Sequence, residues 1–175
     1  RLIQASERLG KLPIYIDETS DITVPEIKAR LRRQDKVDVV IIDYLGIMNS
    51  AKNYNGNRAL EIGEITRSLK IMAKELGVPI IACAQLNRGT EAKGKSHVPA
   101  LADLRDSGSI EQDADIVLFL YRDAYYDGEK GEDEDRSDQS KAECIVAKNR
   151  HGGVGTVDLH WDGQYTRFTS VDVYR

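Results

Sequence analysis

Two apolar segments of the chain end in side chains that could hold a metal-bound nucleotide. Asp43 closes the run VDVVIID (37–43), and Gln85 follows the run VPIIACA (78–84). A carboxylate fixed at the end of a strand can ligate Mg²⁺, directly or through water, because this cation prefers oxygen ligands. A neutral amide can hydrogen-bond a terminal phosphate and lose that bond after hydrolysis. Each residue alone also has a plainer interpretation, since many strands end in an aspartate or an amide by chance.

A third segment matches a phosphate-binding pattern only literally. Residues 89–96 read GTEAKGKS and satisfy G-x-x-x-x-G-K-S. A working loop of this kind joins a strand to a helix, so that the helix N-terminus faces the phosphates. Here Leu86, Asn87 and Arg88 intervene after the strand, and Pro99 disfavours a helix behind Ser96. We therefore interpret 89–96 as a mobile, basic channel or interface loop.

Composition limits the class of protein. A chain of 175 residues, 41% hydrophobic and 31% charged, suits one globular domain with a core of its own. A net charge of -4 argues against a protein whose whole surface binds nucleic acid, although a local basic track is compatible with it. Cys83 and Cys144 lie in apolar, strand-like runs, so we expect buried free thiols and a reducing, cytoplasmic location.

Strands and helices are predicted to alternate along the chain. Apolar runs predict strands at 13–17, 37–43, 78–84 and 115–121; periodicity and capping residues predict helices at 1–9, 23–33 and 58–76. The acidic stretch 122–140 is expected to be a solvated, mobile loop. Residues 141–148 and 154–161 flank Gly152-Gly153 and predict an antiparallel hairpin, with a further short strand at 164–169. This order predicts an α/β domain with a mainly parallel sheet, flanked by helices and ending in a hairpin at one edge.

Four strings of residues resemble the hexameric replicative DNA helicases of the DnaB family. They are VDVVIIDYLGIM, EITRSLKIMAKELGVPIIACAQLNR, DLRDSGSIEQDADIVLFLYRD and IVAKNRHGGVGTV. The resemblance runs from about Leu12 to Phe168, and DLRDSGSIEQDAD is its most diagnostic part. It implies a RecA-like P-loop NTPase core and an ATP-dependent helicase that uses ATP and Mg²⁺.

The resemblance implies nucleotide-site roles for four residues. Asp43 matches the magnesium-site aspartate of the family, and Gln85 matches its γ-phosphate sensor. Lys148 and Arg150 match the basic pair that crosses the subunit boundary to the neighbour's γ-phosphate, where the arginine acts as a finger. Their i,i+2 spacing on a strand puts both on one face. Without the resemblance, this pair would be interpreted as charges that protect an exposed edge strand from aggregation.

The resemblance also implies a DNA-binding loop. Arg105, Asp106, Ser107 and Gly108 match the loop that lines the family's central channel and grips the single-stranded backbone. An arginine can neutralise a phosphate, and a serine hydroxyl or exposed amides near Gly108 can donate to its oxygens. A grip of this kind is independent of sequence, as a motor on DNA requires. Without the resemblance, Arg105 and Asp106 would be interpreted as a local surface ion pair.

The family pattern extends beyond these 175 residues. Its phosphate loop and catalytic glutamate precede the segment that this chain matches, so we expect 1–175 to be a partial motor domain. The collar and linker of the family are likewise expected outside it. The implied partners are single-stranded DNA, further copies of the protein in a six-membered ring, primase and a helicase loader. Gly46 departs from the family, which usually carries a larger polar residue after DYL.

Two other interpretations of the sequence stay open. A RecA-type recombinase or a circadian-clock-like ATPase also carries a strand-end aspartate and a sensor glutamine, although DLRDSGSIEQ and KNRHGG fit the helicases better. Alternatively, the chain by itself is a truncated assembly or DNA-binding module without catalysis. A phosphate loop upstream of Arg1 would favour the motor.

Overall fold

The computed structural model describes residues 2–86, 97–104, 108–129 and 138–171. The helices are α1 (Leu2–Leu9), α2 (Val24–Leu31), α3 (Arg58–Leu76) and α4 (Gly108–Asp113), with 3₁₀ turns η1 (Leu45–Ile47), η3 (Leu101–Asp103) and η4 (Asp123–Glu129). The strands are β1 (Val40–Ile42), β2 (Ile80–Ala82), β3 (Ile116–Tyr121), β4 (Lys141–Asn149), β5 (Gly155–Asp162) and β6 (Arg167–Ser170). No helix among the described residues is long and apolar enough to cross a bilayer.

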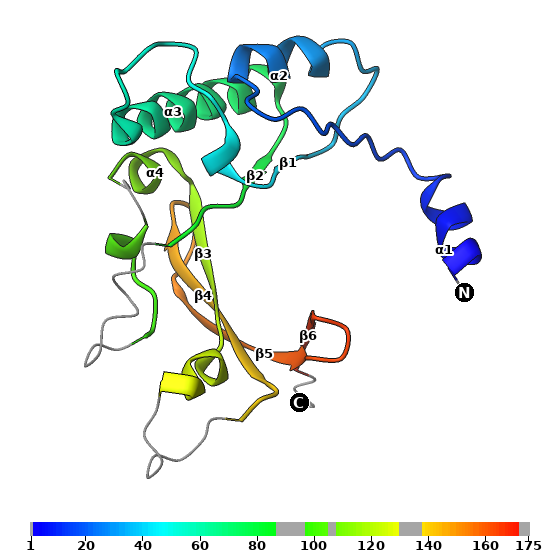
Figure 1. The fold of residues 1–175 in the computed structure, drawn as a ribbon, viewed down its shortest axis with the longest axis vertical. Coiled ribbons are helices and arrows are strands. Elements are labelled where there is room, and N and C mark those ends of the chain that lie inside the picture. The colour runs from blue at the N-terminus through cyan, green and yellow to red at the C-terminus, as the bar shows by residue number, and fades with distance from the viewer. Residues whose placement is uncertain (1, 87–96, 105–107, 130–137, 172–175) are drawn as a thin grey trace.

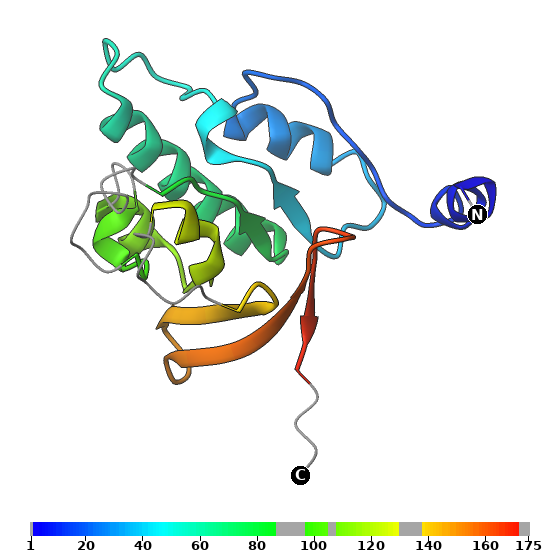
Figure 2. The same cartoon turned by 60° about the horizontal axis from the view of Figure 1, so that its bottom comes forward.

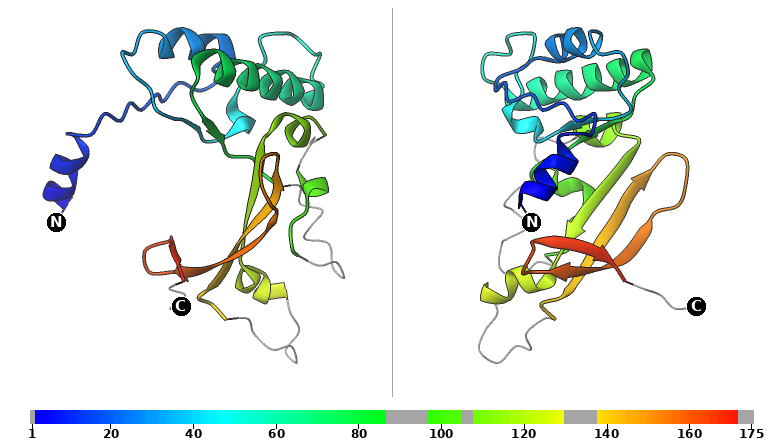
Figure 3. Two further views of the ribbon diagram at one scale, coloured as in Figure 1. Left: turned by 180° about the vertical axis from the view of Figure 1, so that it is seen from behind. Right: turned by 90° about the vertical axis from the view of Figure 1, so that its right-hand side faces the viewer.

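Helices α2 and α3 lie side by side over a short parallel sheet of β1 and β2 (Figures 1 and 2). Helix α4 lies beneath α3, where the antiparallel sheet β3-β4-β5-β6 begins. That sheet curves away from the helical part of the chain (Figure 3). Helix α1 lies apart from the rest, at the end of an extended segment.

Helix α3 has the boundaries that its sequence predicts. The side chain of Asn57 accepts a hydrogen bond from the backbone N–H of Leu60 at 3.3 Å, which caps the N-terminus. At the other end Gly77 adopts φ 66°, a left-handed conformation that favours glycine, and its N–H bonds to Ala73 O. Local signals in the sequence therefore fix both ends of this helix.

The main core lies between α3, α2 and β1. Its buried members are Val24, Ile42, Leu45, Met48, Ile62, Ile65, Leu69 and Met72. The α3 residues among them recur at helical spacing and form the inward face of that helix. Ile65 is 0% exposed, so no part of its side chain contacts solvent.

We expect Ile65→Ala to lower the free energy of unfolding by about 2–5 kcal/mol, because it removes buried methyl groups and leaves a cavity. The loss would be measured by urea unfolding. Ile71→Ala is the matched control, since Ile71 is on the same helix but 48% exposed. Equal losses for the two variants would contradict the assignment of the inward face of α3.

Strands β1 and β2 pair in parallel as predicted, although each is shorter than its apolar run. Val40 pairs with Ile80 and Ile42 with Ala82. The predicted strand at 13–17 is wrong: this segment is exposed and unpaired, with Ile16 83% accessible. A strand needs a neighbouring strand for its backbone hydrogen bonds, and no described strand pairs with this segment.

The α/β class and the C-terminal hairpin are confirmed, but the balance of strand directions differs from the prediction. Among the described strands only β1 and β2 are parallel, whereas β3, β4, β5 and β6 form the larger, antiparallel sheet. Strand β3 buries Val117 and Phe119 and exposes Ile116, Leu118 and Leu120. Its unbroken apolar sequence is typical of a strand covered on both faces, which is why it resembled a parallel one.

Two further predictions need correction. The acidic stretch 122–140 is not a loop throughout, because Asp123–Glu129 forms η4; residues 130–137 lie outside the described part. The two cysteines are free but not buried: Cys83 is exposed and Cys144 is partly so. Cys83 follows β2 and Cys144 lies in β4, and each of these strands has one exposed face. An apolar sequence therefore did not predict burial of the two thiols.

Candidate functional site

Asp43 and Gln85 lie just beyond the carboxyl ends of β1 and β2, as predicted. The pairing continues past the strands: Cys83 N donates to Ile42 O at 2.9 Å, and Leu45 N donates to Cys83 O at 3.0 Å. These bonds hold the segments that carry Asp43 and Gln85 next to each other at one edge of the sheet. Both side chains are exposed, so a ligand can reach them.

The donor set at this edge fits Mg²⁺ with a nucleotide better than a structural metal. No group of three or more acidic, histidine or cysteine side chains among the described residues could hold an ion by itself. Magnesium commonly binds through one or two carboxylates, with water and phosphate oxygens completing an octahedron. Asp43 supplies one such carboxylate at this edge.

Arg58, which the sequence analysis missed, fixes the turn behind Asp43. Its guanidinium donates to the carbonyls of Leu45 at 3.2 Å, Gly46 at 2.9 Å and Met48 at 3.3 Å, and to Glu61 Oε2 at 3.0 Å. A cation at the first residue of a helix is unfavourable to the helix dipole. That mismatch is the signal from which a specific partner for Arg58 could have been predicted.

The glycine that departs from the family pattern lies in the same turn. A Cβ at Gly46 would be 2.1 Å from Cε2 of Tyr44, so the tyrosine ring occupies the space of a side chain at this position. A larger residue at position 46 would require the Tyr44 ring to move. The departure at Gly46 is therefore linked to the orientation of the residue directly after Asp43.

Lys148 and Arg150 lie at the end of β4 and reach the C-terminus of α4. Lys148 Nζ donates to the carbonyl of Glu111, and Arg150 Nη2 donates to the carbonyl of Gln112. Both side chains thus reach the same end of α4, so they lie on one side of the β4 strand, as their spacing predicts. The side chain of Arg150 is 45% exposed, so it is partly held by contacts within this chain rather than free at the hairpin tip.

A β-bulge sets that face. Val146 pairs with Leu118 and Lys148 pairs with Val117, so Ala147 is the extra residue. Cross-strand partners point to the same side of a sheet, which places Lys148 on the side of the buried Val117. In a regular ladder Lys148 would instead share the exposed side. The bulge therefore directs the basic pair toward α4.

The predicted DNA-binding loop is described only at its margins. Arg105, Asp106 and Ser107 lie outside the described residues, and Gly108 is the exposed first residue of α4. Before the loop, Leu104 is buried and forms a bridge with Leu86, the residue after Gln85. One margin of the loop is thus connected to the segment that carries the predicted phosphate sensor, and the other to the helix that contacts Lys148 and Arg150.

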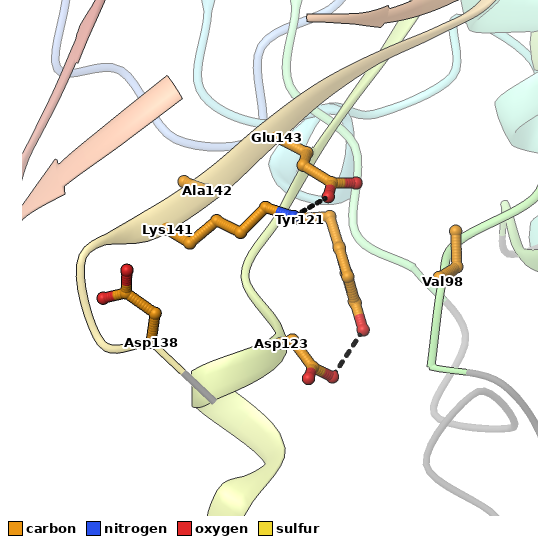
Figure 4. A pocket seen from close by; sticks show the side chains of 7 residues that line it. All are labelled: Val98, Tyr121, Asp123, Asp138, Lys141, Ala142 and Glu143. Carbon is orange, nitrogen blue, oxygen red and sulfur yellow. Dashed lines mark hydrogen bonds and ion pairs between the residues drawn. The ribbon is translucent and has the colours of Figure 1, made fainter. Parts of the chain in front are cut away.

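A cavity of about 340 Å³ lies at the opposite end of β3 and β4 (Figure 4). Its lining residues are Val98, Tyr121, Asp123, Asp138, Lys141, Ala142 and Glu143. Tyr121 OH donates to Asp123 Oδ1 at 2.9 Å, and Lys141 pairs with Glu143 at 3.3 Å. Burial, and then this hydrogen bond, raise the pKa of Tyr121, so the phenol stays neutral. The cavity is separate from the β1–β2 edge and contains none of the predicted site residues.

Comparison with known proteins gives a consistent assignment. Residues 1–170 match the profile of the DnaB-like helicase C-terminal domain. The chain is 43% identical over 175 residues to the replicative DNA helicase DnaC of Bacillus subtilis, covering 98% of the chain and 37% of that protein. It is 42% identical over 172 residues to a probable replicative DNA helicase of Trieres chinensis, covering 96% and 37% respectively. The chain therefore spans little more than a third of the length of these relatives.

Solved structures agree. A DnaB-like replicative helicase, described with its interactions with primase, superposes with a TM-score of 0.84 at 39% identity, over 98% of this chain and 41% of that one. A solved ATPase domain superposes with a TM-score of 0.85 at 39% identity, over 98% and 59%. The RecA-like fold is thereby confirmed. Because this profile matches nearly the whole chain, the chain belongs to the DnaB family of helicases and forms part of their C-terminal domain.

Proposed function

We propose that the protein containing this chain is an ATP-driven replicative DNA helicase. It moves along single-stranded DNA as a ring of six copies and separates the strands of the duplex at a replication fork. The observation that carries the proposal is the parallel pairing of β1 and β2, from whose carboxyl ends Asp43 and Gln85 follow. In open α/β sheets, ligands bind beyond these ends.

The four nucleotide-site residues have distinct roles in this proposal. Asp43 would hold the Mg²⁺ that accompanies the nucleotide. Bound Mg²⁺ would supply positive charge that neutralises the negative charge developing on the phosphate groups during transfer. Gln85 reports whether the γ-phosphate is present, because its amide can bond only to an oxygen that is there. Lys148 and Arg150 act on the nucleotide of the neighbouring copy, which makes each site dependent on two subunits.

The other parts of the protein and its partners are proposed from the relatives. Residues 1–175 form part of a RecA-like motor domain, and the rest of the protein supplies the phosphate loop and a collar. One related structure is described with primase, which supports primase as a partner. A helicase loader, a six-membered ring and a cytoplasmic location belong to the same proposal. The relatives reported above are replicative helicases, which favours this function over a recombinase, a clock-like ATPase or a non-catalytic module.

The proposal is tested with the full-length protein on a forked duplex. We expect ATP hydrolysis that single-stranded DNA stimulates, and strand separation that requires hydrolysable ATP. A recombinase would instead pair a single strand with a homologous duplex. Strand exchange without unwinding, or no hydrolysis with any DNA, would contradict the helicase assignment.

The predicted DNA-binding loop gives a separate expected result. In the full-length protein, Arg105→Ala should weaken binding of single-stranded DNA about equally for all sequences. The slope of log affinity against log salt should fall by about 0.7, the share of one phosphate on a single strand. Arg33→Ala, at an exposed position after α2, is the control and should leave the slope unchanged. A loss confined to some sequences would count against a backbone contact.

A further inference from the structure

Asp115 contacts Arg150 through both its backbone and its side chain. Arg150 N donates to Asp115 O at 2.9 Å, which extends the pairing of β3 with β4 by one bond. The Arg150 Nε atom lies 3.7 Å from Asp115 Oδ1, and Nη2 donates to the carbonyl of Gln112. One backbone bond and two contacts of the guanidinium, all with residues 112 and 115, therefore hold Arg150.

These contacts leave the end of the guanidinium available. Nε and Nη2 share one edge of the planar fork, and this is the edge that Asp115 and Gln112 occupy. The other edge, which includes Nη1, is the one that faces a phosphate when a guanidinium binds it end-on. The printed contacts of Arg150 with the described residues use Nε and Nη2, so Nη1 is the donor that they leave for a phosphate.

Asp115 is itself held by α3. Lys70 of α3 forms an ion pair with Asp115 Oδ2, and the hydrogen bond from Lys70 lowers the pKa of this carboxyl, so it stays ionised. Two positions earlier, Asp113 accepts from Thr66 Oγ1 at 2.9 Å and lies 3.6 Å from Arg67 Nη1. Thr66 is buried, so α4 and the residues after it are fixed to the middle of α3.

The same helix also supports the other half of the nucleotide chemistry. Arg58, the first residue of α3, holds the turn that follows Asp43. Lys70 lies 12 residues further along, which is about 18 Å of helix at 1.5 Å per residue. Helix α3 thus supports two parts of the proposed chemistry. Arg58 holds the turn after Asp43, and Lys70 holds Asp115, which contacts Arg150.

We infer that Asp115 is a positioning residue for the arginine finger: anchored to α3 by Lys70, it holds Arg150 by the Nε edge and aims the free edge at the nucleotide of the next subunit. The inference rests on the proposed function, because it requires Arg150 to act on a neighbouring site. Asp115 touches neither nucleotide nor magnesium in this assignment, and its effect on catalysis passes through Arg150.

The test is Asp115→Asn in the full-length ring. We expect kcat for ATP hydrolysis to fall on the order of tenfold, because small misplacements of a catalytic group are costly. KM for ATP should stay within about twofold, since the residues that bind the nucleotide are intact. Asp115→Glu, which keeps the charge, should recover part of the lost kcat. Asp162→Asn is the matched control and should leave kcat unchanged: it also removes an aspartate that pairs with an arginine, Arg167 at 3.2 Å, but away from Arg150.

The decisive comparison repeats Asp115→Asn in the Arg150→Ala background. A positioning residue should have no further effect there, whereas a merely structural residue should lower kcat by the same factor in both backgrounds, which would overturn the inference. If Asp115→Asn does not assemble into rings, Lys70→Gln, which keeps Asp115 but removes its anchor, goes through the same comparison with the same two outcomes. A full rate for Arg150→Ala alone would instead refute the finger in the proposed function.

Discussion

Replacing Arg150 with alanine is expected to slow ATP hydrolysis by the full-length ring on the order of 10³–10⁵-fold, which is the contribution of an arginine finger. Folding and ATP binding should change little, because Arg150 is half exposed and its partners are the Gln112 carbonyl and Asp115 at the protein surface. The measurement is steady-state hydrolysis at saturating ATP, with nucleotide binding determined separately. Lys141→Ala, at the other end of β4, is the control and should keep its rate.

Lys148→Ala should act in the same direction but more weakly. An ammonium is a point charge and matches the phosphoryl oxygens less well than a planar fork. Lys148 Nζ is also committed to the carbonyl of Glu111 at the C-terminus of α4, an end that favours a cation. A larger loss for Lys148→Ala than for Arg150→Ala would reverse the assignment of the finger within the pair.

Mixed rings separate action on a neighbour from action within one subunit. Arg150→Ala subunits keep an intact Asp43, and Asp43→Ala subunits keep an intact Arg150. A ring containing both therefore has some interfaces where a working Asp43 site meets a working Arg150 from the next copy. Mixing two inactive variants should restore part of the hydrolysis. If mass measurement shows mixed rings and no ratio restores activity, Arg150 does not act across the boundary.

Replacing Asp43 with asparagine is expected to lower kcat on the order of 10²–10³-fold. The charge stabilisation supplied by a correctly held metal is worth several kcal/mol, and each 1.36 kcal/mol is a factor of ten in rate. An amide keeps the size of the side chain but loses the charge that attracts Mg²⁺. The variant should also need more Mg²⁺ for half-maximal rate, which a magnesium titration of hydrolysis would measure.

Asp38→Asn is the matched control for Asp43→Asn. Asp38 lies in the same apolar run, two residues before β1, and forms an exposed ion pair with Lys36 at 2.9 Å. Its removal should leave both the rate and the magnesium requirement unchanged, because exposed pairs of this kind contribute little. Equal effects of the two variants would mean that the charge of the segment matters, and not a metal ligand at the strand end.

The features predicted best from the sequence depend on local signals. Helix α3 has an N-cap at Asn57, a glycine at its C-terminus and apolar residues at helical spacing, so its two ends are set by residues within it. The positions of Asp43 and Gln85 follow from two apolar runs whose parallel pairing the α/β pattern requires. The roles of the site residues stay predictions, since they concern ligands and neighbours.

The features that sequence reasoning missed depend on contacts between distant residues. The direction of β3 is decided by its pairing with β4, which begins 20 residues after the end of β3 at Tyr121. The contacts of Arg58 with the turn after Asp43, and of Asp115 with Arg150, join segments that no periodicity links. The segment 13–17 has the composition of a strand, but composition cannot supply the neighbour that a strand needs.

The bulge at Ala147 makes the number of residues in β4 as important as their identity. Because side chains alternate along a strand, deleting one residue between Val146 and Lys148 would restore a regular ladder and shift the later residues of the strand by one position. A substitution at Ala147 keeps the register, whereas a deletion or a second insertion there changes the face to which the basic pair points. This stretch should therefore resist changes of length, and we expect relatives to keep the same spacing between the apolar part of β4 and the residue that corresponds to Arg150.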